Sequence, residues 1–166
     1  MKPVCRIGKS ACTILLAASM PITAVAAGAA GFCADINHLV DLAGADFADI
    51  VAGSDSDTGN LPATLKLNDA SDCKVSPISG ASTYNCVWEF PLQAPAAYQK
   101  FEDLDRRIQA CFGSLAIGEK DQAVNHPDFY DARRYQLEAT RVTVSVKDKS
   151  TLEHTLVNLW IRAAVR

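Results

Sequence analysis

Residues 73–90, CKVSPISGASTYNCVWEF, decide the fold. In the second half of this stretch every second residue is aromatic or a cysteine: Tyr84, Cys86, Trp88 and Phe90. Alternation with a period of two places these side chains on one face of a β-strand. Ser79, Gly80 and Ser82 are turn-forming residues between the two halves. The sequence therefore predicts a β-hairpin with strands at 73–78 and 83–90.

Amphipathic segments flank this hairpin on both sides. Residues 35–52 carry apolar side chains at three- and four-residue steps, which predicts a first helix with one buried stripe: Ile36, Leu39, Val40, Ala43, Phe47, Ile50 and Val51. A second helix is expected after Pro95, which suits a first turn, and before Gly113, which suits a C-terminal stop. Its inner face comprises Tyr98, Phe101, Leu104, Ile108, Cys111 and Phe112.

Three further strands complete the prediction. Residues 61–67 alternate in polarity, although Pro62 limits them to a sheet edge. Residues 142–146 and 152–164 form the last two strands, whereas 114–134 show little apolar periodicity. The expected order is α-β-β-β-α-β-β. We predict an α+β two-layer sandwich of about five mostly antiparallel strands with two helices on one face.

The first 26 residues read as a secretory signal peptide. Lys2, Arg6 and Lys9 precede an uncharged apolar run at 11–20, and Ala24-Val25-Ala26 provides the small residues of a cleavage site. The run is too short to span a bilayer, so no stable membrane anchor is expected after cleavage. The expected organisation is a signal at 1–26, a flexible mature N-terminus at 27–32 and a single domain at 33–166. The location is then periplasmic or secreted.

Export determines how the cysteines are interpreted. Cleavage removes Cys5 and Cys12 and leaves an even number, Cys33, Cys73, Cys86 and Cys111. Four cysteines in an oxidising compartment imply two disulfides, for which three pairings exist. Hairpin geometry favours Cys73–Cys86, and antiparallel helices favour Cys33–Cys111. No Cys-x-x-Cys pair remains for redox exchange.

Charge and motifs exclude several functions. The chain has 16 Lys and Arg against 19 Asp and Glu, and loss of the signal would shift its net charge from −3 to −6. An acidic surface without clustered basic residues argues against a nucleic-acid partner. Motifs of serine hydrolases, zinc peptidases and phosphate loops are missing. We expect no cofactor and no metal.

One local cluster has residue types suited to acid–base chemistry. His126, Asp128 and Asp131 lie within six residues, in a stretch that has the character of a loop. Their spacing matches no metal motif. They are weak candidates for a catalytic site that no sequence motif marks, and an ordinary loop is the favoured interpretation.

The last strand provides a candidate binding surface. Val157, Leu159 and Ile161 share one face, which we expect to pack on the helices. The opposite face carries His154, Leu156, Asn158, Trp160 and Arg162. Exposed Trp and Arg are typical of interface hot spots. The alternative is that another segment, such as 114–134, covers this face and makes Trp160 part of a core.

The spacing Cys73-x-Val75, Tyr84-x-Cys86-x-Trp88 and a helix ending in Cys111 resembles a frame found in small exported bacterial proteins of unknown function. The resemblance covers residues 33–112. It implies export and the fold only, because it carries no catalytic residues.

The expected function is that of an exported binding module of the bacterial envelope. It would act on a protein partner there, as an inhibitor or an immunity-type protein does, through the face around Trp160. Two alternatives remain at this point. One is a periplasmic enzyme that uses the cluster near His126, and the other is a structural envelope component.

Overall fold

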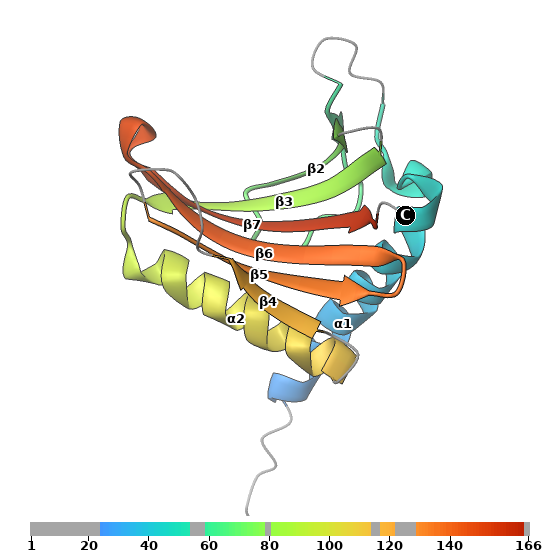
Figure 1. Ribbon diagram of the computed structural model, residues 1–166, viewed down its shortest axis with the longest axis horizontal. Coiled ribbons are helices and arrows are strands. Elements are labelled where there is room, and N and C mark those ends of the chain that lie inside the picture. The colour runs from blue at the N-terminus through green and yellow to red at the C-terminus, as the bar shows by residue number, and fades with distance from the viewer. Residues whose placement is uncertain (1–23, 54–58, 79–80, 114–116, 122–128, 165–166) are drawn as a thin grey trace, which may run out of the picture.

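The computed structural model describes residues 24–53, 59–78, 81–113, 117–121 and 129–164. It is an α+β structure in which one curved antiparallel sheet is covered on one face by two helices (Figure 1). The predicted class and the placement of both helices on the same face are confirmed. Among the described helices, none is long and apolar enough to cross a membrane.

The sheet has the strand order β1-β2-β3-β7-β6-β5-β4, and every neighbouring pair is antiparallel. The strands are β1 Leu61–Pro62, β2 Asp72–Ile78, β3 Ala81–Pro91, β4 Ile117–Asp121, β5 Tyr130–Leu137, β6 Thr140–Lys149 and β7 His154–Ala163. β7, the last strand in the chain, lies between β3 and β6. Residues from the two halves of the sequence therefore become neighbours at the centre of the sheet.

The core lies between the sheet and the helices α1 (Ala24–Leu42) and α2 (Pro95–Phe112). α2 begins at Pro95, as expected, and buries Ala97, Phe101, Leu104 and Ile108. The sheet contributes the period-two faces of β3, β6 and β7, whose apolar side chains are nearly inaccessible to solvent: Tyr84, Cys86, Trp88, Val142, Val144, Val146, Val157, Leu159 and Ile161. Burial of this continuous apolar surface is the main force that holds the two layers together.

The first predicted helix differs from the structure at both ends. α1 starts at Ala24, so it includes residues 27–32, which the sequence predicts as a tail, and it ends at Leu42. Asp46 and Phe47 have φ values of 53° and 59°, which no continuing helix accommodates. Two short 3₁₀ turns, Ala43–Ala45 and Ala48–Ile50, follow instead. The apolar pattern nevertheless marks core positions correctly, since Phe47 and Ile50 are buried.

The number of strands also differs from the prediction. Residues 61–67 form only the two-residue β1, because the Thr64 amide donates to Ile50 O and turns the chain away from the sheet. In contrast, 114–134 supply β4 and the start of β5, which the sequence analysis missed. The sheet is therefore larger than the five strands expected.

Both preferred disulfides are present. Cys73 and Cys86 occupy directly opposite positions of β2 and β3, with Cα atoms 4.1 Å apart. Cys33 of α1 is bonded to Cys111 near the end of α2, with Cα atoms 5.3 Å apart. The hairpin and the pair of helices are thus crosslinked separately.

Candidate functional site

The candidate site lies on the sheet face opposite the helices. On β7, Val157, Leu159 and Ile161 are completely buried against the helical layer, as predicted. The side chains between them face the other way, and Trp160 is 38% exposed. β4 and β5 extend the sheet sideways in the plane of the strands rather than lying over Trp160 (Figure 1). Their described residues therefore do not provide the cover that would make Trp160 part of a core.

Two rows of side chains cross four strands on this face. In the first row, Trp160 of β7 lies between Asn85 of β3 and Thr143 of β6, and Arg134 of β5 is opposite Thr143. In the second row, two residues further along β7, Arg162 lies between Thr83 of β3 and Arg141 of β6. Gln136 of β5 is opposite Arg141 and accepts a hydrogen bond from its Nε at 3.4 Å.

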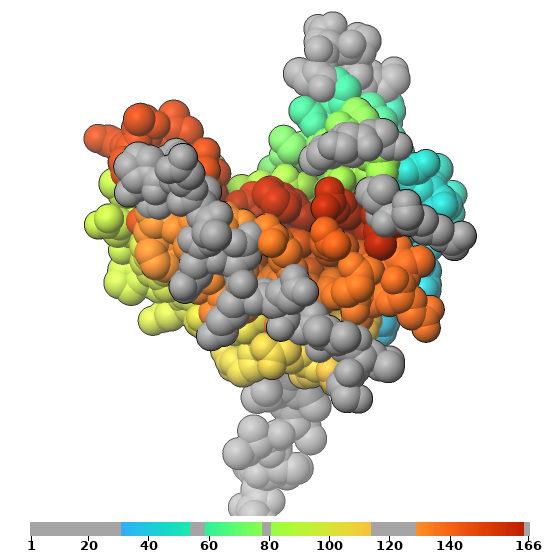
Figure 2. All heavy atoms as spheres, in the orientation of Figure 1, coloured from blue at the N-terminus to red at the C-terminus, as the bar shows by residue number. Residues whose placement is uncertain are grey.

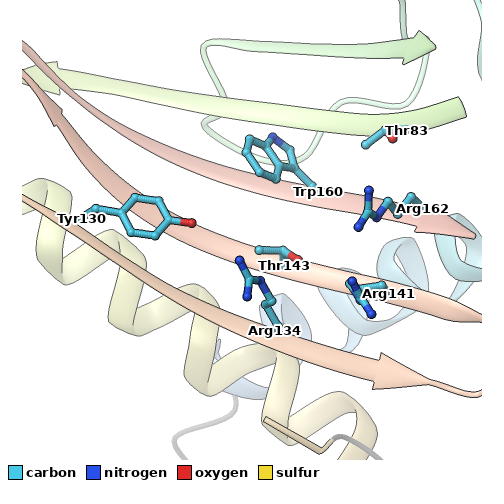
Figure 3. Close-up of a pocket in the computed structure, with 7 residues that line it drawn as sticks. All are labelled: Thr83, Tyr130, Arg134, Arg141, Thr143, Trp160 and Arg162. Carbon is cyan, nitrogen blue, oxygen red and sulfur yellow. The ribbon is translucent and has the colours of Figure 1, made fainter. Parts of the chain in front are cut away.

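A pocket of about 260 Å³ opens between these rows. It is lined by Thr83, Tyr130, Arg134, Arg141, Thr143, Trp160 and Arg162 (Figure 3). Figure 3 shows the Trp160 and Tyr130 rings toward one end and Arg141 and Arg162 at the other, with Arg134 beside Thr143. Figure 2 shows the red atoms of β7 in a hollow between the turn after β6 and the green end of the β2–β3 hairpin. The curvature of the sheet makes this face concave.

The charge of the pocket is opposite to that of the protein. Three arginines line it, and none of the lining residues that the structure describes is an Asp or Glu. The full chain carries a net charge of −3. Clustered charge of one sign in a concave site concentrates its electric field and attracts ions of the opposite sign. The pocket is therefore suited to a negatively charged group.

One polar atom on the pocket wall lacks a partner. Thr83 is 2% exposed, and its Oγ1 has no hydrogen-bond partner in the described part of the chain. The Oδ1 atom of Asn85, one position along the same face, is in the same condition. A buried hydroxyl without a partner costs about 1–3 kcal/mol relative to a satisfied one. The Thr83 hydroxyl remains able to donate to or accept from a bound group.

The predicted binding residues divide into two groups. Trp160 and Arg162 line the pocket, whereas His154, Leu156 and Asn158 lie on the same face nearer the start of β7. His154 is paired with Glu89 of β3 through its Nδ1 atom. The structure thus places all five residues on one face but brings only two of them into the pocket.

Sequence reasoning missed the other five residues that line the pocket. They come from β3, β5 and β6, and they meet Trp160 only because β7 pairs between β3 and β6. Arg141, Thr143 and Ser145 alternate with the core valines of β6, so the sequence predicts which face of the sheet they occupy. The sequence does not predict which strand pairs with β6.

The acid–base candidates are only partly described. His126 and Asp128 lie outside the described residues. Asp131 is on β5, where it is 8% exposed and faces the helical layer rather than the pocket. Its carboxylate forms an ion pair and a hydrogen bond with Arg133.

Asp131 belongs to a buried polar network between β5 and α2. Arg133 also approaches Asp105 at 3.8 Å and Glu102 at 3.7 Å, and its guanidinium lies 4.9 Å from the centre of the Phe101 ring. Burial opposes the charge on Arg133, but the hydrogen bond and attraction of Asp131, helped by Asp105 and Glu102, outweigh it and raise the pKa of Arg133. The guanidinium is therefore a permanent cation that fixes these carboxylates, and the network attaches α2 to the sheet.

Tyr135 extends this network. Its hydroxyl donates to Asp105, and it accepts a hydrogen bond from Gln109 Nε2 at 3.1 Å. Burial and the bond to the Asp105 carboxylate raise the pKa of Tyr135 above its ordinary value. These groups satisfy one another, which is the arrangement of a structural network.

Comparison of the chain with protein-family models, with curated proteins and with solved structures finds no match in any of the three. The geometry of the site is therefore the basis for inferring what the protein does.

Proposed function

We propose that this protein is an exported binding module of the bacterial envelope that recognises a protein partner without catalysing a reaction. An inhibitor or an immunity-type protein would act in this way. The observation that carries the proposal is the exposed Trp160 beside Arg162 at the centre of the concave sheet face. Tryptophan and arginine contribute disproportionately to binding energy at protein interfaces.

Three features support an exported location. The disulfides Cys33–Cys111 and Cys73–Cys86 suit an oxidising compartment. The N-terminal sequence has the order of a secretory signal, and the frame of cysteines and aromatic residues resembles that of small exported bacterial proteins. The intact mass of the exported protein tests this part of the proposal: it should correspond to a chain that begins at Ala27 and contains no free thiol.

The geometry also suits contact by the sheet face. Leu156 and Asn158 continue the surface from Trp160 toward the start of β7, where Val87 of β3 lies opposite Asn158 and Glu89 lies opposite Leu156. The result is an aromatic and aliphatic centre with polar residues around it, as in protein interfaces. A partner with a convex surface would match the curvature of the sheet.

The test is affinity capture from the envelope fraction with the disulfide-bonded protein as bait. Trp160→Ala should abolish capture of the specific partner, because truncation of a central hot-spot residue costs about 2 kcal/mol or more. The control is Arg106→Ala, which truncates an exposed side chain of α2 on the helical side of the protein, away from the concave face. The control should capture the partner as the parent does.

Folding must be measured in the same samples. Both variants should keep the parent's circular dichroism and a cooperative thermal transition. If folded Trp160→Ala captures the same partner as strongly as the parent, the proposal is wrong. A loss of folding in Trp160→Ala would instead show that Trp160 is structural and would also overturn it.

A further inference from the structure

We infer that the pocket lined by Arg134, Arg141 and Arg162 binds a small organic anion, in which a carboxylate or phosphate is attached to a planar body. This inference goes beyond the proposed protein partner, and it holds whether or not that partner exists. It depends on the charge, the strand register and the two aromatic rings of the pocket.

The strand register provides the first argument. Arg141 of β6 and Arg162 of β7 are directly opposite each other on the same face. Like charges at directly opposite positions destabilise a sheet. Among the described residues no carboxylate offsets these charges, because the Arg141 side chain donates to the amide oxygen of Gln136 and Arg162 forms no ion pair. A bound anion between the two guanidinium groups would remove this repulsion.

Arginine chemistry indicates which anion fits. A guanidinium presents a planar set of N–H donors that matches two oxygens of a carboxylate or a phosphate. Arg134 adds a third positive charge from β5, on the side of Thr143 away from Trp160. Arg141 and Arg162 therefore form the polar end of the pocket, and Arg134 adds its positive charge at the side, in the row of Trp160 and Thr143.

The unsatisfied hydroxyl of Thr83 strengthens the assignment. Thr83 is directly opposite Arg162, so its side chain lies beside the arginine pair. Its Oγ1 has no partner in the described residues although it is buried. An oxygen of the ligand would accept a hydrogen bond from this group and satisfy it.

The opposite end of the pocket indicates the chemistry of the uncharged part of the ligand. Trp160 and Tyr130 present aromatic rings there (Figure 3). Aromatic faces favour flat, apolar partners by stacking and by burial of apolar area. The volume of about 260 Å³ is below the usual size of pockets for drug-sized ligands, which begins near about 300 Å³. A single ring with one acidic group fits this space better than a larger ligand.

The experiment compares five probes by titration calorimetry and by NMR of the Trp160 indole N–H. Benzoate and phenyl phosphate carry both a ring and an anion. Benzamide is the neutral counterpart of benzoate, and acetate and inorganic phosphate are anions without a ring. We expect at least one of the ring-bearing anions to bind about tenfold or more tightly than benzamide and than its ring-free anion, because both ends of the pocket contribute.

Substitution locates the binding. Arg162→Gln should weaken the better probe by about tenfold or more, which corresponds to loss of one charge-assisted contact. Arg141→Gln should have a similar effect. The control is Arg106→Gln, which removes an equally positive side chain, 75% exposed, from the helical side of the protein. It should leave binding unchanged.

The thermal transition of the same variants distinguishes a binding role from a structural one. Because Arg162→Gln removes a like-charge repulsion, the ligand-free variant should unfold at a temperature no lower than that of the parent. A lower temperature would indicate that Arg162 supports the fold.

The binding results either identify the acidic group of the ligand or overturn the inference. Tighter binding of benzoate or of phenyl phosphate identifies the acidic group as carboxylate or phosphate. The inference is overturned if no ring-bearing anion binds at millimolar concentration, or if benzamide binds as tightly as the better of the two ring-bearing anions. Equal binding by Arg162→Gln, Arg141→Gln and the parent also overturns it. Partner capture by the parent is measured separately, so failure of anion binding leaves the proposed function intact.

Discussion

Cys33 and Cys111, 78 residues apart in the sequence, are bonded to each other and join α1 to the last turn of α2. The bond closes a long loop that contains the β2–β3 hairpin, which has its own disulfide across a separation of only 13 residues. A crosslink restricts the unfolded chain more strongly when the loop that it closes is longer. The two bonds are therefore expected to differ in their effect on stability.

Replacing both cysteines of one bond by alanine tests this difference. Loss of Cys33–Cys111 should lower the free energy of unfolding by about 4.5 kcal/mol, and loss of Cys73–Cys86 by about 3 kcal/mol, according to the loop-entropy relation. Urea unfolding of the two double variants measures both values. A larger loss for the Cys73–Cys86 variant would contradict this ordering.

Of the charged residues between the sheet and the helices, Arg133 should be the one whose substitution lowers stability most. Arg133→Met leaves the carboxylates of Asp131 and Asp105 buried without their cation, which costs about 3–5 kcal/mol. The same change at Arg106, whose pairing with Asp103 is exposed, should cost less than about 1 kcal/mol. Denaturant unfolding of both variants provides the comparison, and equal losses would argue against the buried network.

Stability should fall at alkaline pH partly through Tyr135. Its pKa in the folded protein is above its ordinary value of 10.0, so the folded state holds the phenolic proton more firmly than the unfolded state. The resulting stabilisation is complete below pH 10 and is lost as the pH rises toward the folded-state pKa. Tyr135→Phe should be less stable at neutral pH by about 1 kcal/mol. Its stability should also decline less steeply above pH 10, and parallel curves for the two proteins would refute this.

Glycine at position 138, in the turn between β5 and β6, should make the protein more stable than the native glutamate does. Glu138 is the first of two residues between Leu137 and Thr140 and has a φ of 44°. This region penalises residues with a Cβ atom by about 1–2 kcal/mol. Glu138→Gly should therefore raise the free energy of unfolding by about 1 kcal/mol. Ala139, which lacks a positive φ, is the control, and Ala139→Gly should not stabilise.

The sequence predicted the parts of the fold that follow simple periodicity. Tyr84, Cys86 and Trp88 alternate on β3, and Phe101, Leu104 and Ile108 recur along α2, so both elements and both disulfides were correctly predicted. These patterns are direct consequences of side-chain burial on one face of an element.

β5 was missed because its buried face is largely polar. Asp131, Arg133 and Tyr135 face the helices and satisfy one another, so the strand lacks apolar alternation. The end of α1 was misplaced for another reason. Its apolar stripe continues through Phe47, although the backbone has a positive φ there and the helix has ended. A hydrophobic pattern predicts which side chains are buried but not the backbone conformation.

The sequence predicted the residues that β7 contributes to the candidate site but not those from the neighbouring strands. The period of β7 placed Trp160 and Arg162 on one face, and the structure confirms this. Arg134 and Arg141 come from strands whose order in the sheet depends on long-range pairing. Such pairing leaves no local signal in a single sequence.

Both covalent bonds lie in the helix-facing layer, since Cys73 and Cys86 share the buried side of the hairpin and Cys33–Cys111 joins the helices. The arginine-bearing side of the sheet contributes no crosslink among the described residues. Substitutions on that side can therefore accumulate without disturbing the two disulfides that crosslink the domain. The same architecture could acquire a new specificity by exchanging a handful of outward-pointing side chains, which makes it a natural starting point for directed evolution of binders.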